Sequence, residues 1–393
     1  MNKKNYKKGY KGVILQLLFL CGIIPYTGLR LLDGETRMYQ RAVKKLEEEG
    51  ILKIEKSRGN KYIRLENRML AQEIIKKNVD EEYIRYYQET VIKNISRMQD
   101  KKILNTERII NSTNTQIMMY ACDIDSGPYK RDIATDEIEN TDLMYSPSME
   151  LKRIRGYADN VKKQKNDTIL NNSRISGVLI SPGGIYSVYN IGKHLIEWKR
   201  YGEVRMQSYL EKTIIRKEKY IREEGRRENL IKGAIIISSN IKTYEDICTI
   251  DYTKQKNKKQ IMMNIDYAYQ KMYCVPQNDI GKQLLKIMTI SNWETKLKEI
   301  ILRPEEIEKE KTVQIACDGY DEKNNIYKLV HVIPDMVKLR AFVTRANLEE
   351  DRNKFAIYCY TWQSEMIVHL VNKNAKIYQI PIEEVIKTIE KGV

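Results

Sequence analysis

Cysteine pairs and clustered histidines are missing from this sequence. The six cysteines stand far apart and no two form a CxxC pair, so nothing supports a zinc ribbon or a thioredoxin-type motif. The three histidines, His194, His331 and His369, lack the spacing of metal ligands. We therefore expect no metal and no cofactor, and reduced, mostly buried thiols in a cytoplasmic protein.

Motifs for phosphate binding and acyl transfer are missing as well. The sequence has no Walker A run, no Gly-x-Gly-x-x-Gly fingerprint and no Gly-x-Ser-x-Gly elbow. Asp123 and Asp125 form a short acidic pair, and residues 316–325 share features with a calcium loop but lack its closing Glu. We interpret the pair as a solvated loop and residues 316–325 as a hairpin turn.

Long hydrophobic runs are also missing. The best candidate, GVILQLLFLCGII at residues 12–24, contains a glutamine and is too short to cross a bilayer. It follows a basic start, but no cleavage pattern of the Ala-x-Ala kind comes after it. We interpret it as a buried helix and expect no membrane partner.

Positive charge is what the sequence has in excess. Its 69 Lys and Arg against 53 Asp and Glu give a net charge of +16. Such a balance favours a polyanionic partner, with nucleic acid ahead of an anionic membrane surface. An AT-rich coding sequence would also enrich Lys, Ile, Asn and Tyr, so the charge alone does not decide whether the protein binds nucleic acid.

The first 66 residues predict three helices. Apolar residues at helical spacing predict a first helix, which Pro25 ends. YTGLRLL at residues 26–32 predicts a short second helix, and Thr36 is a candidate N-cap for a third helix that runs to about Glu49. Gly50 stands where a glycine commonly follows a helix.

A two-stranded hairpin follows the third helix. Residues 51–54 predict a strand, residues 57–61 a turn and residues 62–65 the returning strand. Three helices and a hairpin are the element order of a winged helix-turn-helix domain. We therefore expect a mixed α/β (α+β) chain whose N-terminus, residues 1–66, is such a domain.

Basic residues accompany the third helix and the hairpin tip. The residues of the helix predicted to face the core are Met38, Ala42, Val43 and Leu46. A rigid basic helix suits the major groove, and a basic hairpin tip suits phosphates. The candidate DNA-contacting residues are Arg37, Arg41, Lys44 and Lys45 on the helix, and Lys56, Arg58 and Lys61 on the hairpin. The acidic residues 47–49 indicate that only the N-terminal half of the helix approaches DNA.

Residues 67–111 predict a helical connector, because they contain no Pro or Gly and repeat apolar residues at helical spacing. Two roles stay open. The connector pairs with a second copy, giving a homodimer for two half-sites, or it packs on its own next domain.

Residues 112–393 predict a mixed α/β domain. Residues 174–192 form the clearest hairpin, residues 202–229 a charged helix, and residues 231–240 a strand buried on both faces. Tyr358, Tyr360 and Trp362 would suit base stacking, but aromatic residues in a strand more often pack in a core.

Three stretches carry a family resemblance: LEEEGILKIEK, SGVLISPGGIYSVYN and GEVRMQSYLEKTIIRKEKY. Their order resembles the replication-relaxation proteins of bacterial plasmids and integrative elements. The resemblance implies an N-terminal winged helix joined to a degenerate restriction-endonuclease-like domain. It also implies a double-stranded DNA partner and a role in plasmid replication, mobilisation or transcriptional control.

The hairpin departs from a working nuclease of that fold, which holds its metal with carboxylates. Val178 and Leu179 follow the glycine where an acid is expected, and Asn190 stands in the second arm. Glu203 on the following helix is a further candidate ligand, but the two do not rebuild a two-carboxylate site. We therefore favour a protein that is not an enzyme. The alternatives are a metal-dependent nicking nuclease or relaxase, and a winged-helix adaptor that binds proteins.

Overall fold

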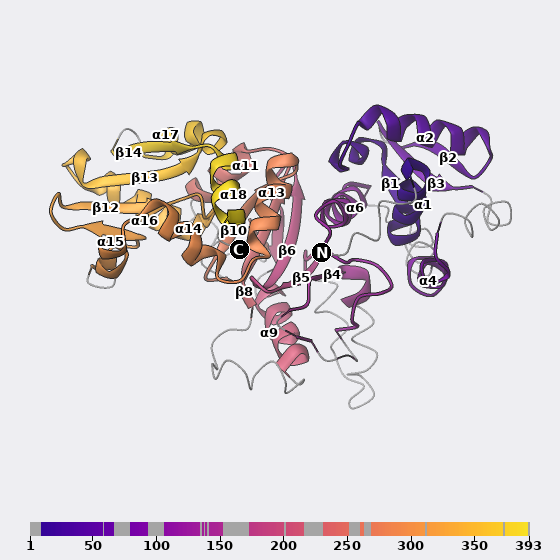
Figure 1. Cartoon of the computed structure of the whole chain (residues 1–393), viewed down its shortest axis with the longest axis horizontal. Helices are drawn as coiled ribbons and strands as arrows, with labels where there is room; N and C mark the ends of the chain where they lie inside the picture. The colour runs from indigo at the N-terminus through magenta and orange to yellow at the C-terminus, as the bar shows by residue number, and fades with distance from the viewer. Residues whose placement is uncertain are drawn as a thin grey trace.

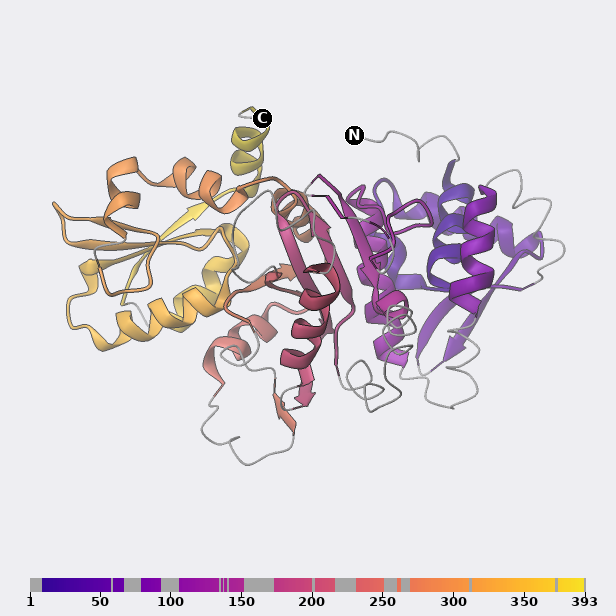
Figure 2. The ribbon, with the colours of Figure 1, turned by 90° about the horizontal axis from the view of Figure 1, so that it is seen from below.

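The chain is a mixed α/β protein with three lobes in a row. The computed structural model describes residues 9–57, 59–66, 79–92, 106–133, 136, 138–139, 141–151, 173–199, 202–215, 231–250, 260–262, 269–310, 313–371 and 374–391. Figures 1 and 2 show the N-terminal lobe at one end, a central lobe, and the C-terminal lobe at the other end. Within the described residues, no helix has both the length and the hydropathy to cross a membrane.

The N-terminal lobe contains helices packed on a three-stranded antiparallel sheet of order β1-β3-β2. Its elements are α1 (Gly9–Cys21), β1 (Ile23–Pro25), the 3-10 helix η2 (Tyr26–Leu31), α2 (Thr36–Glu48), β2 (Leu52–Ser57) and β3 (Asn60–Leu65). The predicted third helix and hairpin form close to their expected bounds, and the predicted second helix is a 3-10 helix. The first helix ends at Cys21, so the prediction that it continues to Pro25 was wrong: Gly22 has a φ of 75° and residues 23–25 form β1, which pairs with β3. Gly50 adopts a φ of 68° just after α2, a conformation that glycine enters without strain.

The buried face of α2 differs from the prediction at one position. Its buried residues are Tyr39, Ala42, Val43 and Leu46. Met38 is only half-buried, so its assignment to the core was wrong. Tyr39 takes that place because its ring packs edge-on against Tyr10, with centroids 4.9 Å apart, while its hydroxyl donates to the Asp33 carbonyl at 2.8 Å.

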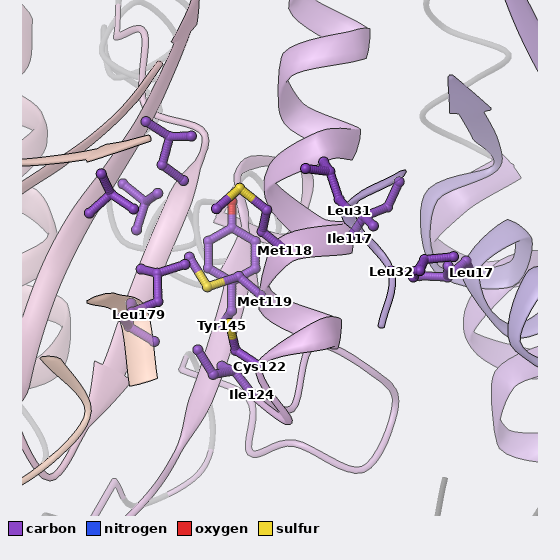
Figure 3. Packing of buried hydrophobic residues seen from close by; sticks show 14 of the residues in the cluster. Leu17, Leu31, Leu32, Ile117, Met118, Met119, Cys122, Ile124, Tyr145 and Leu179 are labelled. Carbon is purple, nitrogen blue, oxygen red and sulfur yellow. The ribbon is translucent and has the colours of Figure 1, made fainter. Parts of the chain in front are cut away.

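Helix α6 (Thr106–Ala121) joins the N-terminal lobe to the central lobe. In Figure 3, Ile117 lies beside Leu31 on one side of this helix, while Met118 and Met119 reach Tyr145 on the other side. All three α6 side chains are fully buried. The helix continues past residue 111, so the end of the expected connector and the start of the expected α/β domain are one element.

Two further described turns of the connector pack on the N-terminal lobe. Helix α4 (Glu81–Tyr86) and the π-helical turn η3 (Tyr87–Val91) both contact α1. The described parts of residues 67–111 thus contact their own chain.

The central lobe is built on a five-stranded sheet of order β10-β8-β6-β5-β4. Its strands are β4 (Met144–Pro147), β5 (Gly177–Ser181), β6 (Gly184–Gly192), β8 (Ile231–Ser238) and β10 (Met272–Pro276). Strands β4, β5 and β6 run antiparallel, and β6, β8 and β10 run parallel. The predicted hairpin at 174–192 and the predicted central strand at 231–240 are both confirmed.

Three helices accompany this sheet, of which the first two lie between its parallel strands in the chain. They are α9 (Gly202–Ile215), α11 (Lys242–Thr249) and α13 (Asp279–Met288). The predicted helix at 202–229 is present to residue 215, and residues 216–230 lie outside the described part. A two-stranded ribbon, β7 (Glu197–Lys199) with β9 (Gln260–Met262), lies near α9.

The C-terminal lobe has a four-stranded sheet of order β11-β12-β13-β14, in which the last three strands are parallel. Its strands are β11 (Gly319–Asp321), β12 (Ile326–Val330), β13 (Phe355–Tyr360) and β14 (Lys376–Ile380). Its helices are α14 (Trp293–Ile301), α15 (Pro304–Lys309), α16 (Met336–Leu348), α17 (Ser364–Val371) and α18 (Ile382–Lys391), with short 3-10 turns η6 (Arg352–Lys354) and η7 (Thr361–Gln363).

Two hydrophobic clusters cover opposite faces of the central sheet. One is continuous from α1 and α2 through α6 to α13, α14 and α18. The other contains the core of α9, β8, α16 and α17. Each cluster spans more than one lobe, so the lobes share core packing.

Candidate nucleic-acid interface

The cations of α2 share one exposed face. At about 100° per residue, Arg37, Arg41 and Lys44 lie within about 60° of one another around the helix axis, and Lys45 lies beside them. All four are exposed. The buried stripe of α2 lies on the opposite side of the helix. Packing of that stripe therefore turns the basic side chains outward together.

Few carboxylates of the described part neutralise this face. Lys44 lies 3.7 Å from Glu48, and the Arg41 guanidinium lies 3.8 Å from the Met38 sulfur. Among the described residues, Arg37, Arg41 and Lys45 have no ion-pair partner. These guanidinium and ammonium groups are available to an external anion.

The acidic residues at the end of α2 mostly bond to the lobe itself. Glu47 accepts a hydrogen bond from the Ile54 backbone N–H at 3.1 Å, and Glu49 forms an ion pair with Lys11 of α1 at 2.5 Å. Glu48 alone of the three lies on the cationic face. Its position on that face was not singled out by the sequence reasoning, although helical spacing contains the signal.

The hairpin β2–β3 carries two pairs of opposed cations that differ in their surroundings. Lys53 opposes Arg64, and Glu55 bonds to both, at 3.0 and 2.9 Å. Burial raises the pKa of the Glu55 carboxyl, but the hydrogen bonds from Lys53 and Arg64 outweigh it, so the pKa is lowered overall.

Lys56 opposes Lys61 nearer the tip, and both are exposed. Among the described residues no carboxylate pairs with either one. The Lys61 ammonium lies 5.8 Å from the centroid of the Tyr26 ring, in a cation–π position. Arg58, the third candidate on the hairpin, lies outside the described residues. Within the described part of the hairpin, Lys56 and Lys61 therefore form a pair of like charges with no carboxylate partner.

The N-terminal lobe also concentrates charge. Residues 1–66 contain 15 Lys and Arg against 7 Asp and Glu, a net charge of +8, which is half of the total of +16 in about one sixth of the chain. The cationic face therefore lies in the most basic part of the sequence.

An interaction that links lobes lies directly before α2. Lys282 of α13 bonds to Asp33 at 2.5 Å and to Asp279 at 2.9 Å. The Lys282 side chain is only 7 % exposed. Asp33 and Lys282 are separated by 249 residues in the chain, and no local sequence pattern signals their contact.

The hairpin of the central lobe is the place where a working nuclease of the resembled fold would hold its metal, and the sequence offered only Asn190 and Glu203 there. The Asn190 amide donates to Thr115 at 3.1 Å and to Gln277 at 3.0 Å, and its oxygen accepts from the Gly192 N–H. Glu203 accepts hydrogen bonds from the Ser173 hydroxyl, the Tyr189 hydroxyl and the Arg174 N–H, each at 2.7 Å. Both candidate ligands therefore already have protein partners.

Burial of Glu203, which is 2 % exposed, raises the pKa of its carboxyl. Across the described ranges, no group of three or more His, Cys, Asp or Glu residues gathers at metal-binding distance.

The remaining candidates have structural roles. Asp125 accepts a hydrogen bond from the Gly127 N–H in the loop after α6, and Asp123 has a φ of 59° in the same turn. Residues 316–325 contain β11 and the turn that leads to β12, and in that turn Asp321 bonds to Asn324. Tyr360 is fully buried in the core, as alternating aromatics in a strand predict.

The six cysteines are free, and four of them are buried. Burial raises the pKa of every one of these thiols. A raised pKa reduces the thiolate fraction and hence the reactivity. The expectation of reduced, mostly buried thiols is thus consistent with their surroundings.

Comparisons of this chain with protein-family models, with curated proteins and with solved structures gave no match.

Proposed function

We propose that this chain binds double-stranded DNA through its N-terminal lobe, and that this lobe is a winged helix with α2 as its recognition helix. The observation that carries the proposal is the shared exposed face of Arg37, Arg41 and Lys44, opposite the buried stripe of α2. The β1-β3-β2 sheet supports it, because it places a hairpin directly after that helix.

The hairpin supplies a second argument. Like charges directly opposite one another on a β-ribbon destabilise it by a fraction of a kcal/mol. Glu55 removes that cost for Lys53 and Arg64. Lys56 and Lys61 have no such carboxylate among the described residues, and a DNA phosphate would supply the missing negative charge.

The rest of the chain acts as a platform in this proposal. The central lobe is a degenerate restriction-endonuclease-like domain without metal-dependent cleavage, which agrees with the occupied hydrogen bonds of Asn190 and Glu203. Together with the sequence resemblance, this favours a cytoplasmic protein of a bacterial mobile element of the replication-relaxation kind. Its role would lie in replication, mobilisation or transcriptional control.

The test is a binding titration with a labelled duplex at several salt concentrations. We expect the double variant Arg37→Ala/Arg41→Ala to weaken binding at least tenfold at moderate salt and to reduce the salt dependence. The matched control is Arg205→Ala/Arg345→Ala, which removes the same charge from exposed sites on α9 and α16. Equal losses for the two variants would contradict the assignment of α2.

Two further outcomes separate the alternatives. Nicking of supercoiled plasmid in Mg²⁺ or Mn²⁺ that disappears in Glu203→Gln would establish the nuclease and remove the proposed platform role. Failure of the intact chain to bind any duplex at any salt concentration would favour an adaptor that binds proteins.

A further inference from the structure

We propose that Arg37 and Arg41 form a pair of guanine readers, so that the preferred duplex carries guanines within a window of two or three base pairs. This inference rests on the proposed DNA-binding function and adds a base preference to it.

The spacing of the two arginines fits adjacent steps of a duplex. They lie at positions i and i+4 of α2, which places them about 6 Å apart along the helix axis. Successive bases of a DNA strand rise by about 3.4 Å. A helix lying along the major groove therefore presents the two guanidinium groups to bases about two steps apart.

The surroundings leave both guanidinium groups free to bond outward. Neither arginine has a carboxylate partner among the described residues, and Glu47 and Glu49 near the end of α2 bond to Ile54 and Lys11 instead. Lys44 differs, because Glu48 lies 3.7 Å away and offsets part of its charge. The first two turns of α2 therefore present the strongest unpaired donors.

The chemistry of arginine selects guanine. In the major groove guanine presents two acceptors, O6 and N7, and the planar guanidinium donates to both at once. A lysine ammonium is a point charge on a flexible stem and gives less directional recognition. Gln40, which directly precedes Arg41 in sequence and is half-buried, would instead suit the donor and acceptor of adenine.

The backbone beneath these side chains is held firmly, which a base reader requires. Tyr39 lies between them in sequence on the buried side and bonds to Asp33. Asp33 is in turn bonded to Lys282 of the central lobe. These bonds connect the start of α2 both to the N-terminal lobe and to the central lobe.

The experiment selects duplexes from a randomised pool with the full-length protein and then titrates single duplexes. The variants Arg37→Lys and Arg41→Lys keep the charge and remove the planar fork. Arg30→Lys is the matched control, because Arg30 is exposed on η2 and lies outside α2.

We expect the wild type to enrich guanine-containing duplexes and to bind them at least tenfold more tightly than duplexes in which adenine replaces the guanines. Arg37→Lys and Arg41→Lys should each lose the preference at one of the two guanines, and the two substitutions combined should lose most of it. Arg30→Lys should keep the preference.

Three results separate the claims. Tight binding by the wild type without any guanine preference would overturn the inference and leave DNA binding intact. A preference that survives both lysine substitutions would overturn the assignment to Arg37 and Arg41. Absence of binding to every duplex would overturn the proposed function and this inference together.

Discussion

Asp335 offers a direct test of how the C-terminal lobe is attached to the central sheet. Its Oδ1 atom accepts backbone N–H bonds from Met272 of β10 at 3.2 Å and from Val337 of α16 at 3.0 Å, and the residue is 7 % exposed. Burial raises the pKa of the Asp335 carboxyl to about 6, although the two N–H bonds and Lys271 act in the opposite direction.

The sign of the pH dependence follows from that raised pKa. In the unfolded chain an aspartate ionises near pH 4. Between about pH 4 and 6 the unfolded chain releases this proton while the folded chain keeps it, so the free energy of unfolding falls across that window. Above about pH 6 both states have released the proton, and the free energy of unfolding falls no further on account of Asp335. A difference of about 2 pKa units corresponds to about 3 kcal/mol.

Asparagine at this position keeps the oxygen that accepts both N–H bonds and removes the charge. We therefore expect Asp335→Asn to raise the free energy of unfolding by up to about 3 kcal/mol at pH 7.5 and to change it by less than about 0.5 kcal/mol at pH 4. Urea denaturation followed by tryptophan fluorescence at several pH values measures this.

A control is Asp351→Asn, because Asp351 caps a 3-10 turn in the same lobe but is exposed. It should show no comparable pH-dependent gain. Destabilisation by Asp335→Asn at pH 7.5, or an equal gain at both pH values, would refute the reasoning.

Three further substitutions test other parts of the structure. Neither ring nitrogen of His331 has a partner among the described residues, and burial lowers the pKa of its imidazole to about 4. Between pH 6.5 and 4 the unfolded chain therefore binds a proton that the folded chain does not, so the protein loses stability as the pH falls through that range. We expect His331→Leu to abolish this loss and to raise the melting temperature measured at about pH 5. Lys56→Gln should stabilise the free protein by about 0.2–1 kcal/mol in urea denaturation, because it relieves the repulsion from Lys61, and should weaken duplex binding in the same salt titration used for α2. Glu48→Gln should strengthen duplex binding severalfold at low salt, since it removes the one carboxylate on the cationic face of α2; weaker binding would show that Glu48 serves recognition.

Local patterns in the sequence predicted the elements that depend on neighbours along the chain. Helix α2 ends before Gly50 because glycine takes the positive φ of that position without strain. The β5–β6 hairpin and the central strand β8 follow from alternating and continuous apolar runs. Helical spacing also predicted that the basic residues of α2 lie outside its core-facing stripe, although it assigned Met38 rather than Tyr39 to that stripe.

Contacts between distant segments were not predictable from the same patterns. The bond between Asp33 and Lys282 depends on how α6 and α13 pack, and the bond of Asn190 to Gln277 depends on the parallel order of β6, β8 and β10. Nor does spacing distinguish Lys56, which has no carboxylate beside it in the described part, from Lys53, which has Glu55. These differences arise only once strands pair and lobes pack.

The N-terminal lobe packs closely against α6, the helix that joins it to the central lobe. A Cβ atom on Gly28 of η2 would lie 2.8 Å from the Asn114 oxygen and 2.9 Å from the Ile117 side chain, so η2 and α6 approach as closely as a glycine allows. Met118 and Met119, on the other side of α6, are buried against the central lobe. The lobe that carries α2 is therefore held in one orientation relative to the central sheet. A duplex bound to Arg37 and Arg41 in the proposed way would take its direction relative to the central sheet from that orientation.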